Sequence, residues 1–130
     1  MIIGIGCDIV ESSYISKLGW MSDENTLRRV FASSEILLSP ELEAEKYYSS
    51  RFAIKEAILK CLGTGMEDGI SLNDIEIKKT DKGRLQASLN GEIKKIADFK
   101  NIDTWHISLS HSGDSSVAFV IAENQNKQKT

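Results

Sequence analysis

The chain contains 130 residues, of which 41% are hydrophobic and 27% are charged, and its formal net charge is −3 at pH 7. These proportions are ordinary for a globular protein, and we expect residues 1–130 to form a single domain with a polar, frayed tail at 124–130. The net negative charge argues against general binding of nucleic acids. The uncharged apolar runs are too short to span a bilayer, and no positively charged secretion signal precedes them, so we expect a cytoplasmic protein without membrane association.

The first predicted element is a buried β-strand over residues 1–11, where β-branched side chains are frequent. Side chains alternate between the two faces of a strand, so Gly4, Gly6 and Asp8 share one face. Two glycines followed by a carboxylate indicate a place where another group approaches the backbone closely, with Asp8 beside the gap. The structural alternative is that Asp8 caps the end of the strand before a turn.

Two helices are expected in the middle of the chain. Ser22 is a suitable N-cap for a helix that continues to Phe31, and Pro40 is expected in the first turn of a long helix. The long helix is apolar almost all round over 51–62, which predicts that it is largely buried, and Gly63 ends it.

Four charged residues interrupt this apolar helix. At roughly 100° per residue, Glu56 and Lys60 share one narrow sector, and Arg51 and Lys55 share a second. Charges on a buried helix are costly unless they are paired, bound to a metal or facing a ligand. From this segment alone, two ordinary i,i+4 salt bridges and a ligand site are both open interpretations.

Two hairpins and a short helix complete the predicted elements. Residues 75–89 predict a β-hairpin, residues 91–99 a short helix, and residues 105–122 a second hairpin. Together the elements predict an α+β fold, with an antiparallel sheet of about five strands and the long helix packed across it.

The C-terminal hairpin contains both histidines of the chain. His106 lies on the same face as two serines, whereas His111 ends an apolar row on the other face, next to the hairpin loop. A histidine at a strand end is often a structural hydrogen-bonding group. A metal-bound pair of histidines would need further His or Cys ligands nearby, and the sequence offers none there.

Three segments, taken in order, resemble one known family. They are Gly4-Ile-Gly-Cys-Asp8-Ile-Val-Glu11, Phe52-Ala-Ile-Lys55-Glu56-Ala-Ile-Leu-Lys60 with Gly63-Thr-Gly65, and His106-Ile-Ser-Leu-Ser-His111-Ser. Their order and spacing are similar to those of the holo-acyl-carrier-protein synthase family of 4′-phosphopantetheinyl transferases, from Met1 to about Glu123. Each segment is a weak signal singly, and the three in order are specific.

The resemblance implies an Mg²⁺-dependent enzyme. It would move 4′-phosphopantetheine from coenzyme A to a serine hydroxyl of an apo acyl carrier protein and release adenosine 3′,5′-bisphosphate. The family uses the positions of Asp8 and Glu56 for metal, which suits a hard cation that prefers carboxylate, phosphate and water oxygens. Lys60, one helical turn from Glu56, would meet a phosphate oxygen, so the implied catalytic residues are Asp8, Glu56 and Lys60. Glu56 and a metal-bound water are both open as acceptors of the serine proton.

The resemblance also implies where coenzyme A binds and how the chain assembles. The implied contacts to the nucleotide and its phosphates are Arg51, Lys55, Lys60, Gly63, Thr64, Gly65 and His111. The family further implies a homotrimer with active sites at the clefts between subunits. The carrier is open: those of fatty-acid biosynthesis, of polyketide synthesis and of other pathways are all candidates.

One departure from the family concerns the docking of the carrier, which is acidic. Family members that serve fatty-acid carriers tend to have a basic helix after the Asp8 strand. Here the region offers only Lys17, Arg28 and Arg29 as basic residues. Two interpretations are open: the carrier differs from those of fatty-acid synthesis, or docking leans more on the apolar candidates, which are Tyr14, Leu18, Met21 and Phe31.

Two other functions fit the same residues. One is a catalytically silent module that binds coenzyme A or a nucleotide, and the intact Asp8, Glu56 and Lys60 argue against it. The other is a structural α+β oligomer in which the charged helix positions form salt bridges between subunits. Failure to bind coenzyme A would favour the structural oligomer.

Overall fold

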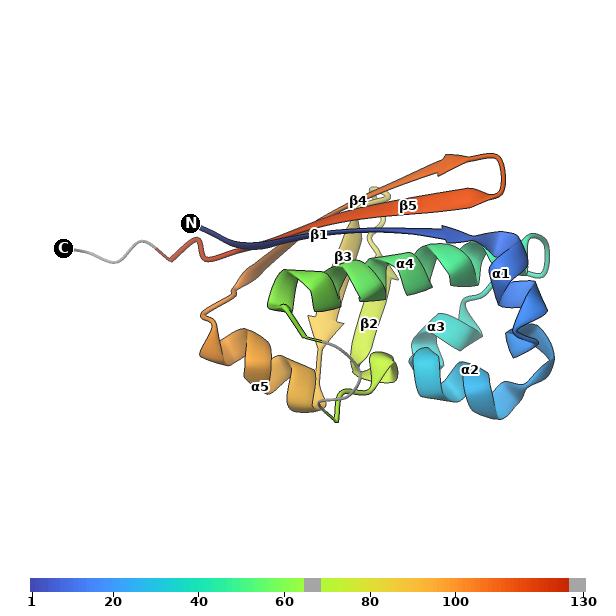
Figure 1. The fold of residues 1–130 in the computed structure, drawn as a ribbon, viewed down its shortest axis with the longest axis horizontal. Helices are drawn as coiled ribbons and strands as arrows, with labels where there is room; N and C mark the ends of the chain where they lie inside the picture. Colours follow the sequence, from blue (N-terminus) through green and yellow to red (C-terminus); the bar gives the residue numbers. More distant parts are fainter. Residues whose placement is uncertain (65–68, 127–130) are drawn as a thin grey trace.

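The computed structural model describes residues 1–64 and 69–126, and its strands form two antiparallel sheets (Figure 1). In the first sheet, β1 (Ile2–Glu11) pairs with β5 (Ser115–Glu123), which pairs with β4 (Thr104–Ser112). In the second, β2 (Ile75–Lys79) pairs with β3 (Leu85–Leu89). The predicted α+β class and the antiparallel pairing are confirmed, although the strands divide into sheets of three and two instead of one continuous sheet.

The helices partly follow the expected boundaries. They are α1 (Ser12–Lys17), α2 (Glu24–Val30), α3 (Ser33–Leu37), α4 (Ala44–Leu62) and α5 (Gly91–Phe99), with short 3-10 turns at Trp20–Ser22 and Leu72–Asp74. The expected N-cap at Ser22 is wrong, because the side chain of Asp23 accepts the backbone N–H groups of Asn25 and Thr26. The long helix begins at Ala44 and not near Pro40.

Helix α4 packs against β1 at unusually close range, and the two glycines allow it. A Cβ atom added to Gly6 would lie 1.9 Å from the carbonyl oxygen of Ala57, and one added to Gly4 would lie 2.2 Å from that of Cys61. No real Cβ atom tolerates such distances, so only glycine fits at both positions. The prediction of a close approach beside Asp8 is confirmed, and the approaching group is the backbone of α4.

The three-stranded sheet has one covered face and one open face. Helix α4 lies on the inner face, where the β5 residues Ala118, Val120 and Ala122 are fully buried (Figure 1). The outer face carries Ile5, at 56% exposure, and Ile9, at 63%. The expectation of a buried first strand therefore holds for one face only. Within the described residues, no helix is both long and apolar enough to cross a membrane.

Candidate active site

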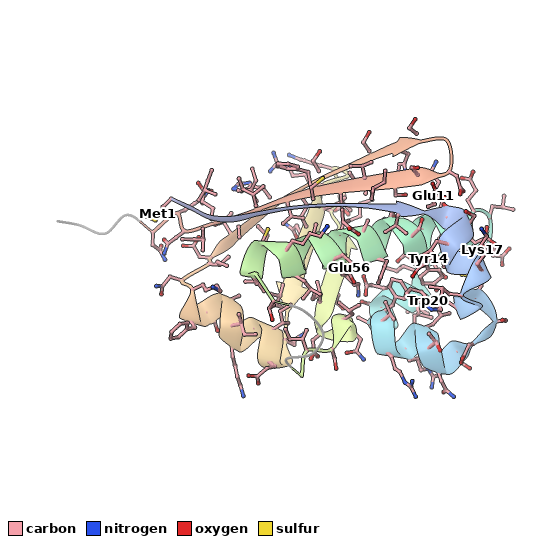
Figure 2. All side chains as sticks on the ribbon, viewed as in Figure 1. Met1, Glu11, Tyr14, Lys17, Trp20 and Glu56 are labelled. Atoms are coloured by element: carbon pink, nitrogen blue, oxygen red, sulfur yellow. The ribbon has the colours of Figure 1, made fainter. Side chains whose placement is uncertain are left out.

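Asp8 and Glu56 are brought together where β1 passes α4. Asp8 lies on the inner face of β1, two residues beyond the Gly6 contact, and Glu56 precedes Ala57, the α4 residue at that contact. Both carboxylates line a cavity of about 420 Å³ that also includes Tyr14 and Phe52. Figure 2 shows Glu56 near the middle of α4 and Tyr14 further along toward α1. The expected pairing of these two side chains in one site is present in the structure.

The electrostatics of the pair favour a cation. Burial raises the pKa of Glu56, the negative charge of Asp8 raises it further, and the positive charge of Lys60 works in the opposite direction. The charged forms of two carboxylates that repel each other are stabilised by any positive charge placed between them.

Lys60 already supplies part of that charge. Its Nζ donates to Asp8 Oδ1 at 3.0 Å and to the carbonyl oxygen of Cys7 at 2.8 Å. The ion pair therefore joins α4 to β1 and does not run along the helix to Glu56. The side chain of Lys60 is 55% exposed, so its ammonium group remains accessible to a ligand.

The donor set suits Mg²⁺ as a partial coordination sphere. Among residues 1–64 and 69–126, no three His, Cys, Asp or Glu side chains gather to hold a metal. Mg²⁺ is commonly held by one or two carboxylates and completes its shell with substrate phosphates and waters. Asp8 and Glu56 meet that requirement when a phosphate-bearing substrate supplies the rest.

Arg51 and His111 form a second cluster. His111 Nδ1 lies 3.0 Å from Ser116 Oγ, and the pKa of His111 is lowered by partial burial and by the nearby charges of Lys46 and Arg51. The guanidinium of Arg51 lies over the ring of Tyr47, at 4.4 Å from the ring centre. Arg51 Nε is buried and has no hydrogen-bond partner within the described part of the chain. A charged arginine side chain that is only partly buried and lines a cleft suits an anionic ligand.

This second cluster borders a larger, basic cleft of about 870 Å³. The cleft runs from α4 to the β2–β3 hairpin, which contributes Lys79 and Arg84. Both of these residues were missed by sequence reasoning. Both lie close to a turn that the sequence predicts only as part of a surface hairpin. No sequence pattern near that hairpin indicates that it lies close to Arg51.

Lys55, for which a phosphate contact is expected, lines neither of these two cavities. Its side chain is fully buried, and its ammonium group is enclosed by Glu35 and by backbone carbonyl groups. Lys55 and Arg51 share a helical sector, but their environments differ: Lys55 is fully buried, whereas Arg51 is only partly buried.

Gly63 ends α4 as expected, in a left-handed conformation with φ of 66°. The next residue, Thr64, donates its backbone N–H to the carbonyl oxygen of Leu59. Gly65 lies outside the described residues. Contact of these three residues with a nucleotide stays a prediction.

The two clusters lie on opposite sides of α4. Arg51 and Glu56 are five residues apart, which turns them about 140° from each other around the helix axis. In the sheet, Asp8 is on β1 and His111 is on β4, and β5 runs between those strands. One copy of the chain therefore does not bring all the expected site residues into one cavity.

Comparison with known proteins identifies one family. The family model described as the 4′-phosphopantetheinyl transferase superfamily matches residues 4–122. The chain is 39% identical to a holo-(acyl-carrier-protein) synthase of Hydrogenovibrio crunogenus over 126 residues, which are 96% of this chain and 99% of that protein.

Solved structures are similar over almost the whole chain. The crystal structure of the holo-(acyl-carrier-protein) synthase of Neisseria meningitidis matches with a TM-score of 0.85 and 31% identity, covering 95% of this chain and 100% of that one. The synthase of Helicobacter pylori, solved in complex with coenzyme A, matches with a TM-score of 0.78 and 31% identity, covering 92% and 99%.

Proposed function

The chain belongs to the 4′-phosphopantetheinyl transferase superfamily, and from that premise we propose that it is a holo-(acyl-carrier-protein) synthase. It transfers 4′-phosphopantetheine from coenzyme A to a serine hydroxyl of an apo acyl carrier protein and releases adenosine 3′,5′-bisphosphate. The observation that carries the proposal is the meeting of Asp8, Glu56 and Lys60 at the β1–α4 contact, beside a cavity.

The reaction is a phosphoryl transfer, which requires positioning of the reactants and neutralisation of charge on the diphosphate. Asp8 and Glu56 would hold Mg²⁺, which when bound supplies most of that neutralisation. Lys60 orients Asp8 through the 3.0 Å ion pair and presents its exposed ammonium group to a phosphate oxygen. Glu56, with its raised pKa, is the candidate among the chain's own residues for accepting the serine proton.

Arg51 and His111 bind the nucleotide phosphates, together with Lys79 and Arg84 from the β2–β3 hairpin. Four basic or imidazole side chains around one cleft suit the phosphate groups of coenzyme A. Since this cleft lies across α4 from Asp8 and Glu56, the complete site needs one half from each of two copies of the chain.

Assembly into a homotrimer would supply those two halves. The open face of the three-stranded sheet supports assembly, because it gathers exposed apolar side chains from two adjacent strands, including Ile5, Ile9 and Phe119. Contiguous apolar surface of this kind marks protein–protein contact in soluble proteins.

The proposed activity is tested by incubating the chain with an apo acyl carrier protein and coenzyme A, with Mg²⁺ or with a chelator. Mass spectrometry of the carrier is expected to show one added phosphopantetheine with Mg²⁺ and none with the chelator. Binding of coenzyme A without any added mass on fatty-acid or polyketide carriers would instead support the silent binding module.

A further inference from the structure

Lys55 and Glu35 form a fully buried ion pair that joins several elements. Both side chains have 0% exposure, and Lys55 Nζ lies 2.6 Å from Glu35 Oε1. Lys55 comes from α4 and Glu35 from α3. Charges are expensive to bury, so a pair this deep is retained only where every polar atom is well satisfied.

The surroundings of the pair satisfy it. Lys55 Nζ also donates to three carbonyl oxygens: those of Val30 at 2.8 Å, Leu72 at 3.1 Å and Ile75 at 2.7 Å. These lie at the end of α2, in the 3-10 turn and at the start of β2.

Glu35 in turn accepts the backbone N–H groups of Ala32 at 2.8 Å and Ile77 at 3.3 Å. Through these hydrogen bonds, the ammonium group of Lys55 and its partner Glu35 connect α4 to α2, α3 and the second sheet.

The position of this connection along α4 relates it to the active site. Lys55 directly precedes Glu56, so any rotation or sliding of α4 about the Lys55 anchor displaces the Glu56 carboxylate. On the other side, the glycine contacts of β1 hold the backbone of α4 at Ala57 and Cys61. The helix is thus fixed from both sides within one turn of Glu56.

We infer that the Lys55–Glu35 pair is a positioning device that sets Glu56 against Asp8, and that Lys55 is not a ligand for coenzyme A. This inference rests on the proposed function, in which Asp8 and Glu56 act together. The buried groups that orient metal ligands from behind typically alter metal affinity or activity about 10- to 100-fold when they are removed.

The test compares the wild type with two variants. Lys55→Met alone leaves the carboxylate of Glu35 buried and uncompensated, so it is expected to unfold readily. Combining Lys55→Met with Glu35→Gln removes both buried charges and keeps an acceptor for the Ala32 N–H, so this variant is expected to fold. Lys94→Met, which breaks the exposed Lys94–Asp98 pair on α5, is the matched control.

Two measurements are made below the melting temperature of each protein. In the double variant, kcat and the affinity for Mn²⁺, titrated with the protein alone as a probe of the carboxylate pair, are each expected to fall about tenfold or more. The KM for coenzyme A is expected to stay within about twofold of the wild type, because Lys55 does not reach the nucleotide cleft. The Lys94→Met control is expected to change none of these.

Two outcomes would overturn the inference. A folded double variant with wild-type kcat and Mn²⁺ affinity would mean that the pair serves stability alone. A raised KM for coenzyme A with unchanged Mn²⁺ affinity would indicate that Lys55 takes part in binding the nucleotide. A wild type that transfers the group but binds no Mn²⁺ would count against the proposed metal site, while the separation of kcat from KM would still decide the role of Lys55.

Discussion

The carboxylate of Glu56 is a charged group whose partial burial costs free energy in the metal-free protein. Its pKa is raised by burial and by the charge of Asp8, and Lys60, the nearest compensating charge, is bound to Asp8 instead. A group whose pKa is higher in the folded than in the unfolded state binds its proton more tightly when folded. The free energy of unfolding therefore falls as pH rises from the unfolded pKa through the folded pKa.

Glu56→Gln is consequently expected to leave the metal-free protein as stable as the wild type, or more stable, at neutral pH. The variant should also lose part of the decline in stability that the wild type shows as pH rises above the ordinary range of a glutamate. Urea unfolding of both proteins in a chelator, over a series of pH values, measures this. A large loss of stability in the variant would indicate that Glu56 is a structural ion-pair partner.

The two cysteines are expected to differ sharply in reactivity. Burial raises the pKa of Cys61 to about 11, and its Sγ lies 3.3 Å from the carbonyl oxygen of Val120, whereas Cys7 is exposed on the outer face of β1. The thiolate is the reactive form, so a thiol reagent near pH 8 should spare Cys61 in the folded protein and modify Cys7 in an isolated subunit, whereas assembly through the open sheet face should slow the modification of Cys7. Peptide mapping after labelling checks this, and rapid modification of Cys61 would contradict the buried position of α4 against β5.

At the scale of elements, the contact between β1 and α4 is what brings the two carboxylates of the proposed metal site together. Gly6→Ala would force a Cβ atom against the carbonyl oxygen of Ala57, so the strand and helix must separate. We expect a loss of about 3 kcal/mol in the free energy of unfolding, the upper part of the usual range for overpacking. Transfer activity should fall as well, since Asp8 moves away from Glu56.

Gly19→Ala provides the matched control for Gly6→Ala. Gly19 has a left-handed backbone, with φ of 71°, and open space around its Cβ position. Alanine at this position is expected to lower the free energy of unfolding by about 1 kcal/mol, the cost of the left-handed backbone conformation alone. Equal losses of stability in the two variants, measured by urea unfolding, would show that the close approach of α4 is not what requires Gly6.

The docking of the carrier is also a property of elements. Phe31 is 1% exposed and belongs to the core, so the expectation that it helps to dock the carrier is wrong. Tyr14 and Leu18 are half-exposed on and beside α1, and Tyr14 also lines the Asp8–Glu56 cavity (Figure 2). The surface around α1 is therefore the candidate approach for the carrier serine.

Charge reversal on this surface is expected to weaken carrier binding selectively. Lys17→Glu and Arg29→Glu should raise the KM for carrier severalfold and leave the KM for coenzyme A unchanged, because both side chains are exposed and opposite charges favour encounter. Arg28→Glu should have less effect, since Glu24 already pairs with Arg28 at 2.7 Å. Lys95→Glu on α5 is the control. Unchanged carrier KM in both Lys17→Glu and Arg29→Glu would place the docking surface elsewhere.

The sequence predicted best those features that follow from local geometry. The alternation that put Gly4, Gly6 and Asp8 on one face, and His111 on the apolar row, holds in the strand register. The environment of Lys55 could not be predicted in this way, because the carbonyl groups around it come from segments distant in the sequence. The short helices α1 and α3 were missed for a related reason: fewer than two turns leave no periodic pattern to detect.

For the whole molecule, the central question is whether the two halves of the site come from different copies of the chain. Asp8→Ala removes one half and Arg51→Ala the other, so each variant alone is expected to be inactive. If the halves meet between copies in a closed ring, subunits mixed at random in equal amounts form intact sites at about a quarter of the interfaces.

The decisive measurement is therefore the transfer activity of the two variants after they are unfolded and refolded together. Recovery of about a quarter of the wild-type activity, from two proteins that are inactive when refolded separately, is the predicted result. Mixtures that remain inactive while assembling normally, or wild-type activity that persists in a monomer, would contradict a site shared between copies.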